Sequence, residues 1–166
     1  MPVPTIEWIG GVDGKIKIID QTLLPNELKY VYCDDRKSIY HAIKTLMVRG
    51  APAIGIAGAM GAVVGIKDDK SEDFDSFFKE FKEVIAYLGS SRPTAVNLFW
   101  GLKRMEETAQ KNSQKPVSEI KEILLNEAKT ILEKDKVICR KIGENGEAFL
   151  EEGSCVLTHC NAGGLA

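Results

Sequence analysis

The chain has 166 residues, of which 44% are hydrophobic and 28% charged, and its formal net charge is −2. This apolar content is enough for a hydrophobic core, and the charge gives no reason to expect a nucleic-acid partner. The most apolar run, residues 51–66, contains four glycines and is shorter than the roughly 20 residues of a membrane span. We therefore expect neither nucleic acid nor membrane as a partner.

The four cysteines, Cys33, Cys139, Cys155 and Cys160, form no CxxC pair. This pattern is typical of reduced thiols in a cytosolic protein, and the ligand spacing of structural zinc sites is missing. The first residues have neither the basic nor the apolar region of a signal peptide. We expect a cytoplasmic protein without a metal site.

The first part of the chain predicts a small antiparallel β unit. Residues 5–9 and 15–20 have strand-like patterns, and the glycine-rich spacer 10–14 between them is typical of a hairpin. Residues 15–19 alternate polar and apolar, which suits a sheet with one solvated face. A third short strand is expected over residues 30–33.

Helical periodicity follows. We expect a helix from about residue 36 to 48, a second through 51–66, and a third that starts with Ser71 as N-cap and stops at Gly89. A fourth helix is expected from Thr94 to about residue 110, and a long fifth from about Ser118 toward residue 150. Residues 1–150 thus predict an α+β unit, a small antiparallel β unit plus a helical bundle.

Residues 151–166 predict the start of a Rossmann-like α/β domain whose remainder is missing. Residues 154–158 have the pattern of a short buried strand, and a thiol, an amide and glycines follow it. Open α/β sheets present reactive groups at the carboxyl ends of such strands. A parallel strand also needs partner strands and covering helices, for which no residues remain.

Two segments combine an arginine with a predicted helix start. In Arg49-Gly50-Ala51-Pro52 the proline suits the first turn of a helix, and in Ser91-Arg92-Pro93-Thr94 either Thr94 or Ser91 could cap the next one. Free amides at a helix start plus a guanidinium suit a phosphate-sized anion. From spacing alone, a basic residue that simply precedes a turn is the favoured interpretation of Arg49, and one arginine before a helix is weak evidence. Two similar entrances, however, suggest donors that converge on one anion.

Cys160 lies directly after the predicted strand, between His159 and Asn161. A buried structural cysteine is the ordinary interpretation, but its neighbours are polar residues and glycines. His159 is not expected to be its general base, because adjacent residues on a strand point to opposite faces.

Three motifs together resemble the methylthioribose-1-phosphate isomerases of methionine salvage. They are Arg49-Gly50-Ala51-Pro52-Ala53-Ile54-Gly55, Ser91-Arg92-Pro93-Thr94-Ala95-Val96-Asn97-Leu98 and Thr158-His159-Cys160-Asn161-Ala162-Gly163. The resemblance extends in order over the whole chain. It overrides the ordinary interpretation of the Arg49 turn.

The resemblance implies roles for several residues. Arg49, Gly50 and Ala51 would help hold the substrate, Arg92 would contact its phosphate, and Cys160 would be one of two catalytic residues. Asn161 and Gly163 would support the site. The second catalytic residue, an aspartate, would belong to the C-terminal domain, which this chain does not contain, so that the chain alone is expected to be inactive. No metal or organic cofactor is implied, and the complete protein is expected to be a homodimer.

The implied reaction converts S-methyl-5-thioribose 1-phosphate to S-methyl-5-thioribulose 1-phosphate. Two other activities fit the same scaffold: ribose-1,5-bisphosphate isomerase, and a non-catalytic regulatory subunit like those of the initiation factor 2 nucleotide exchange factor. A degenerate remnant, or one half of a split enzyme, is a further possibility. Retention of Cys160 and both arginine motifs favours an enzyme.

Overall fold

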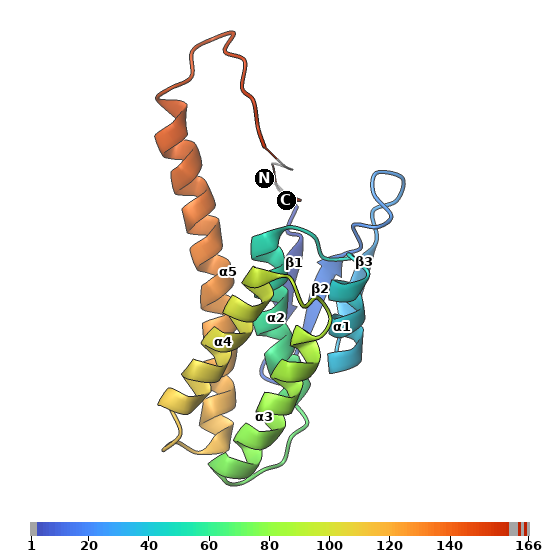
Figure 1. The fold of residues 1–166 in the computed structure, drawn as a ribbon, viewed down its shortest axis with the longest axis vertical. Coiled ribbons are helices and arrows are strands. Elements are labelled where there is room, and N and C mark those ends of the chain that lie inside the picture. The colour runs from blue at the N-terminus through green and yellow to red at the C-terminus, as the bar shows by residue number, and fades with distance from the viewer. Residues whose placement is uncertain (1–2, 160–162, 164, 166) are drawn as a thin grey trace.

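The computed structural model describes residues 3–159, 163 and 165, which form a three-stranded sheet followed by five helices (Figure 1). The strands are β1 (Ile6–Ile9), β2 (Lys15–Ile19) and β3 (Tyr30–Cys33). The helices are α1 (Arg36–Lys44), α2 (Ala51–Ile66), α3 (Phe74–Gly89), α4 (Val96–Lys111) and α5 (Val117–Glu147). This order confirms the predicted β unit and helical bundle.

The sheet is antiparallel, with β2 between β1 and β3. Ile16 and Ile18 of β2 are fully buried against the helices. Lys17, between them, faces the other side, where its ammonium lies 2.9 Å from a Glu7 carboxylate oxygen and 4.3 Å from the centre of the Tyr30 ring. The alternating pattern of β2 therefore gives one packed and one solvated face, as predicted.

Helix α1 ends four residues earlier than the sequence predicts. The backbone of Leu46 has a φ of 65°, a conformation that no helix contains, and the Val48 N–H donates to the Ala42 carbonyl oxygen at 3.3 Å. The expected last turn of the helix is thus replaced by a tight bend that leads into Arg49 and Gly50.

Asp35 begins α1 with a capping box. Its carboxylate accepts the N–H of Ser38 at 2.6 Å, and the Ser38 hydroxyl oxygen accepts the N–H of Asp35 at 3.3 Å. The Ser38 N–H holds the pKa of the Asp35 carboxyl below its ordinary value.

Replacing this cap gives a first testable prediction. Asp35→Ala should lower the free energy of unfolding near neutral pH by about 1 kcal/mol. Because the folded-state pKa is depressed, this contribution is complete above the carboxyl's unfolded pKa and disappears as pH falls through the folded pKa. Urea denaturation of both proteins at several pH values measures it; a difference that stayed constant down to strongly acidic pH would contradict the cap.

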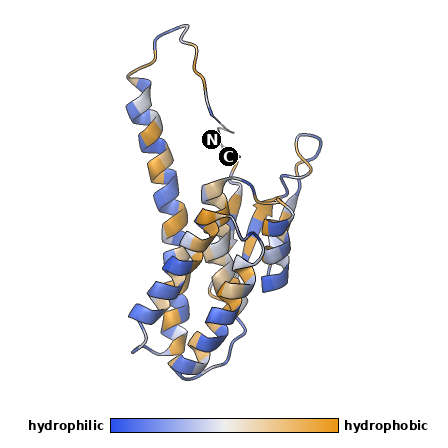
Figure 2. Ribbon diagram, viewed as in Figure 1, coloured by the Kyte–Doolittle hydropathy of each residue, from blue (hydrophilic) through white to orange (hydrophobic). Residues whose placement is uncertain are grey.

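Helix α2 is the centre of the bundle. It packs against the other four helices and the sheet, and most of its residues, including Ile54, Met60 and Val63, are buried. Figure 2 shows that its residues are largely hydrophobic, whereas those of the other helices are more mixed. This confirms the prediction of an interior helix for the glycine-rich run.

Helix α3 begins two residues later than expected for Ser71 as N-cap. Asp73 is the N-cap, and its carboxylate accepts the N–H of Ser76 at 2.8 Å. The Ser71 hydroxyl instead donates to Asp69 at 2.9 Å, within the preceding turn. The prediction that the helix stops at Gly89 is confirmed.

Helix α5 packs only through its first half. Residues Ile120, Leu124 and Ile131 are buried, whereas almost all of the residues from 133 to 147 are exposed as the helix projects beyond its neighbours (Figure 1). The projecting half mixes hydrophobic and hydrophilic residues (Figure 2). Within the described part of the chain, no helix is both long and apolar enough to cross a membrane.

The expected buried strand over residues 154–158 is not formed. These residues have no regular secondary structure, and Val156 and Leu157 are 60% and 98% exposed. A strand requires a hydrogen-bonded partner, and none of the described residues pairs with this segment. The prediction of a buried strand is therefore wrong for this structure, and the start of a Rossmann-like domain over 151–166 stays a prediction.

Candidate functional site

Helices α2 and α4 come into backbone contact near their N-termini. A Cβ atom on Gly55 would lie only 2.7 Å from the carbonyl oxygen of Asn97, and one on Gly101 would lie 2.4 Å from the carbonyl oxygen of Gly55. Only glycine permits such an approach. The two helix starts are therefore held side by side.

A cavity of about 890 Å³ lies where these two helix starts meet. It brings together four of the residues predicted to bind substrate, Arg49, Gly50, Ala51 and Arg92, although Arg49 and Arg92 are 43 positions apart in sequence. The remaining lining comes from the same two helix starts, the bend after α1, the second half of α5 and the end of the chain: Leu46, Pro52, Ile54, Thr94, Ala95, Val96, Asn97, Cys139 and Gly163.

Both helix starts leave amide groups for a ligand. Among the described residues no side chain caps α2 at Gly50 or α4 at Ala95; the Ser91 hydroxyl, one of the two expected caps, donates instead to the Leu88 carbonyl oxygen at 2.6 Å. The first amides of a helix have no partner inside it. Ala51 and Val96 are the first residues of α2 and α4 and both line the cavity, so their amides can donate to a ligand there. The positive end of each helix dipole is also there.

Gly50 has φ 91° and ψ 131°, a conformation that side-chain-bearing residues rarely adopt. It lets the chain turn from the bend at Leu46 into α2, and Arg49, which is exposed, lines the cavity. Arg92 is partly buried on the opposite helix start. The cavity thus has two guanidinium groups and two helix N-termini, a combination suited to a phosphate.

The predicted residues near the chain end are only partly described. Gly163 lines the cavity, while Cys160 and Asn161 lie outside the described residues. The sequence interpretation did not single out Cys139, whose sulfur lies 4.0 Å from a carboxylate oxygen of Asp135. The sequence around Cys139 has no pattern that predicts a place in a cavity. Only the packing of α5 against its neighbours puts this cysteine there.

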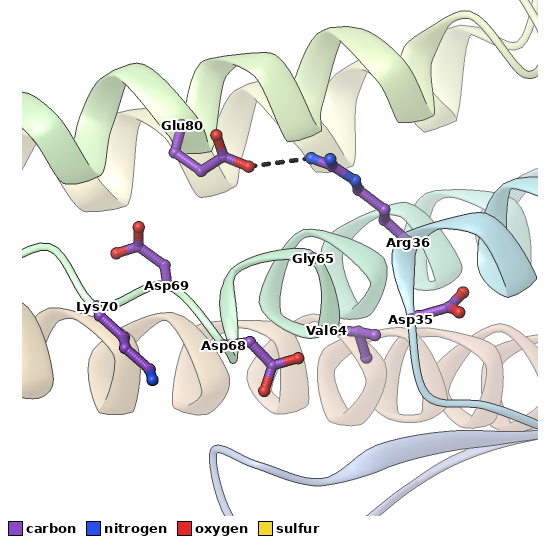
Figure 3. Close-up of a pocket in the computed structure, with 8 residues that line it drawn as sticks. All are labelled: Asp35, Arg36, Val64, Gly65, Asp68, Asp69, Lys70 and Glu80. Atoms are coloured by element: carbon purple, nitrogen blue, oxygen red, sulfur yellow. Dashed lines mark hydrogen bonds and ion pairs between the residues drawn. The ribbon is translucent and has the colours of Figure 1, made fainter.

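A second cavity, of about 500 Å³, lies at the opposite end of α2 and differs in charge (Figure 3). Four carboxylates and two cations line it, and Arg36 is paired with Glu80 at 3.0 Å. The excess of negative charge would repel a phosphate. No three His, Cys, Asp or Glu side chains of the described residues are grouped so that they could hold a metal ion.

Residues 47–166 match the Initiation factor 2 subunit family. The chain belongs to this family. The matched region includes every residue of the cavity except Leu46.

Curated relatives carry two names. A "Methylthioribose-1-phosphate isomerase" from Geobacter sulfurreducens is 46% identical over all of this chain and 47% of its own length. A "5-deoxyribose 1-phosphate isomerase" from Clostridium botulinum is 50% identical over 97% of this chain and 46% of its own. The chain therefore spans slightly less than half the length of these relatives.

Two solved structures share the fold. The 5-methylthioribose 1-phosphate isomerase of Pyrococcus horikoshii superimposes with a TM-score of 0.74 at 34% identity, over 81% of this chain and 37% of that one. A structure titled as the delta subunit of translation initiation factor eIF-2B from A. fulgidus gives 0.86 at 41% identity, over 99% and 46%. These matches confirm both the sequence-based resemblance and the predicted fold class.

Proposed function

We propose that this chain forms the phosphate-binding part of an aldose–ketose isomerase that acts on a five-carbon sugar 1-phosphate. The observation that carries the proposal is the convergence of Arg49, Arg92 and the starts of α2 and α4 on one cavity. Relatives of about 50% identity that are named as sugar-phosphate isomerases support it.

The donors of the cavity suit a phosphate ester. Two guanidinium groups supply charge and paired N–H donors, while the amides at Ala51 and Val96 add uncharged donors at the positive ends of two helices. These groups come from a rigid contact between two helices, so that the phosphate would be held in a fixed place relative to the sugar carbons. Such positioning lowers the barrier of the chemical step.

The proposed substrate is S-methyl-5-thioribose 1-phosphate, which would be converted to S-methyl-5-thioribulose 1-phosphate in methionine salvage. The Clostridium botulinum relative gives a specific second candidate, 5-deoxyribose 1-phosphate. The two compounds carry the same phosphate on C1 and differ only at C5, where both are apolar. The phosphate-binding cavity serves either one.

The reaction conserves all atoms. The bond between C1 and the ring oxygen breaks and that oxygen gains a proton; hydrogen moves from C2 to C1, and the C2 hydroxyl loses its proton as the C2 carbonyl forms. An acid/base pair can carry these protons. We propose that Cys160 shuttles a proton or stabilises the transition state without a stable covalent adduct. Its partner would be an aspartate of the C-terminal domain, in a protein that functions as a homodimer.

Two alternatives remain testable. Ribose 1,5-bisphosphate would need a second cationic site for its 5-phosphate. The A. fulgidus structure has the same fold and is named as a subunit of a translation initiation factor, not as an isomerase. A subunit of that kind would have no need of the two arginines at the cavity.

The test is to incubate the complete product of the gene with S-methyl-5-thioribose 1-phosphate, 5-deoxyribose 1-phosphate and ribose 1,5-bisphosphate, and to follow ketose formation by NMR. We expect turnover of at least one of the first two, abolished or strongly reduced in Cys160→Ser. Absence of turnover with all three compounds would contradict the proposal. Near-normal turnover in Cys160→Ser would refute the role of that thiol.

A further inference from the structure

The bend between α1 and α2, residues 45–50, leads into Arg49 through a backbone conformation that is unfavourable by itself. Leu46 has a φ of 65° although it bears a large side chain, and that side chain is 40% exposed, so that its burial contributes little. Backbone conformations of this kind persist only where the surrounding structure holds them, and they cluster at ligand-binding sites. The contacts that hold the bend therefore bear on the placement of Arg49.

Two hydrogen bonds hold the backbone of the bend from different parts of the chain. The Val48 N–H donates to the Ala42 carbonyl oxygen of α1 at 3.3 Å, and the Val48 side chain is buried in the core. From the β unit, the Gln21 N–H donates to the Met47 carbonyl oxygen at 3.1 Å. Met47 is two residues before Arg49, so this second bond fixes the chain immediately before the arginine.

The Gln21 N–H is oriented by a turn that the Asp20 carboxylate closes. One carboxylate oxygen of Asp20 accepts both the N–H of Thr22 at 3.0 Å and the hydroxyl of Thr22 at 2.6 Å. Gln21 lies inside this turn, which therefore sets the direction of its N–H. Asp20 follows β2 directly, and its own N–H donates to the Lys29 carbonyl oxygen at 2.9 Å. Hydrogen bonds thus connect the end of β2 with the bend that carries Arg49.

Asp20 is a charged residue of which only 6% is exposed. Burial of a carboxylate costs free energy, and Asp20 forms no ion pair with any residue that the structure describes. No described residue before Leu46 lines the phosphate-binding cavity, so the β unit can act on it only through a neighbouring segment. Closure of the loop after β2 would be a purely structural role for Asp20. The bond from Gln21 to Met47 gives the same turn a second role, at the cavity.

We infer that Asp20 is a positioning residue for phosphate binding: its turn holds the Gln21 N–H against the Met47 carbonyl oxygen and thereby fixes Arg49 at the cavity. The inference rests on the proposed function, because it assumes that Arg49 binds the phosphate of the substrate. A guanidinium that is held in place before binding loses less conformational entropy when the phosphate arrives. The small β unit would therefore contribute to phosphate affinity without touching the ligand.

The experiment is a double-mutant cycle between Asp20 and Arg49 in the complete gene product. Calorimetric titration with inorganic phosphate gives the Kd of the wild type, Asp20→Ala, Arg49→Met and the double variant. Asp20→Ala should weaken phosphate binding by about 3- to 10-fold, part of the effect of losing a charged hydrogen bond. It should have no further effect once Arg49 is replaced, because the two residues act through the same contact. An equal weakening in both backgrounds would overturn the inference.

The conservative variant Asp20→Asn separates the role of the turn from that of the charge. It keeps a side-chain oxygen that can accept both hydrogen bonds from Thr22, so phosphate affinity should stay at the wild-type level. A loss as large as that of Asp20→Ala would contradict the turn. If Asp20→Ala does not fold, Thr22→Val takes its place in the cycle. It removes only the hydroxyl of an exposed residue and should cause a smaller loss, again absent from the Arg49→Met background.

Asp73→Ala is the matched control. The Asp73 carboxylate also accepts a backbone N–H, that of Ser76 at 2.8 Å, but it caps α3 and does not line the cavity. Its loss should lower the melting temperature and leave phosphate affinity unchanged. If the wild type binds phosphate and the cycle is additive, the role of Asp20 is refuted while the phosphate site stands. A wild type without affinity for phosphate would overturn both.

Discussion

Arg92→Met should weaken the binding of inorganic phosphate and of sugar 1-phosphates by about 10- to 100-fold. Arg92 is partly buried and lines the cavity at the start of α4, where its guanidinium would form charge-assisted hydrogen bonds with the phosphate. Each hydrogen bond to a charged group contributes about 1.5–3 kcal/mol, and every 1.4 kcal/mol changes the affinity tenfold. Calorimetric titration of the complete gene product with phosphate and substrate measures the loss.

Arg36→Met is the matched control for this prediction. Arg36 lines the acidic cavity at the other end of α2, where it is paired with Glu80 (Figure 3). Its removal deletes the same charge from the molecule but should leave phosphate affinity unchanged. Equal losses in both variants would mean that overall charge, and not the cavity at the helix starts, determines phosphate binding.

Gly55→Val should lower the free energy of unfolding by about 3 kcal/mol. The new Cβ would lie 2.7 Å from the carbonyl oxygen of Asn97, so α2 and α4 must move apart. Overpacking of a tight contact costs about 1–3 kcal/mol, occasionally more. In a protein of this size the melting temperature should fall by roughly 6–12 °C, and phosphate affinity should fall with it because the two helix starts separate.

Gly143→Val is the control for this change. Gly143 lies in the projecting half of α5, and a Cβ there would meet nothing within 4 Å. The same substitution should therefore change the free energy of unfolding by less than about 0.5 kcal/mol. Thermal and urea denaturation compare both variants with the wild type; comparable stabilities for the two would contradict backbone contact between α2 and α4.

The sequence predicted the secondary structure well where local chemistry decides it. The polar–apolar alternation of β2, the proline at the start of α2 and the glycine at the end of α3 are local signals, and the structure follows them. The predictions failed where the structure depends on more than the local pattern. The bend at Leu46 replaced the last turn of α1, and the segment 154–158 has no partner strand among the residues that the structure describes.

The candidate site divides in the same way. By itself the sequence determined the donor groups of the site. An arginine followed by proline and small residues occurs twice before a helix start, and each arginine supplies a guanidinium group. Only the tertiary structure decided that Arg49 and Arg92 share one cavity, because their distance depends on the glycine-mediated contact of α2 with α4. It also decided that Cys139 lines that cavity: the position of α5 beside α2 and α4 sets its place, and no local pattern encodes it.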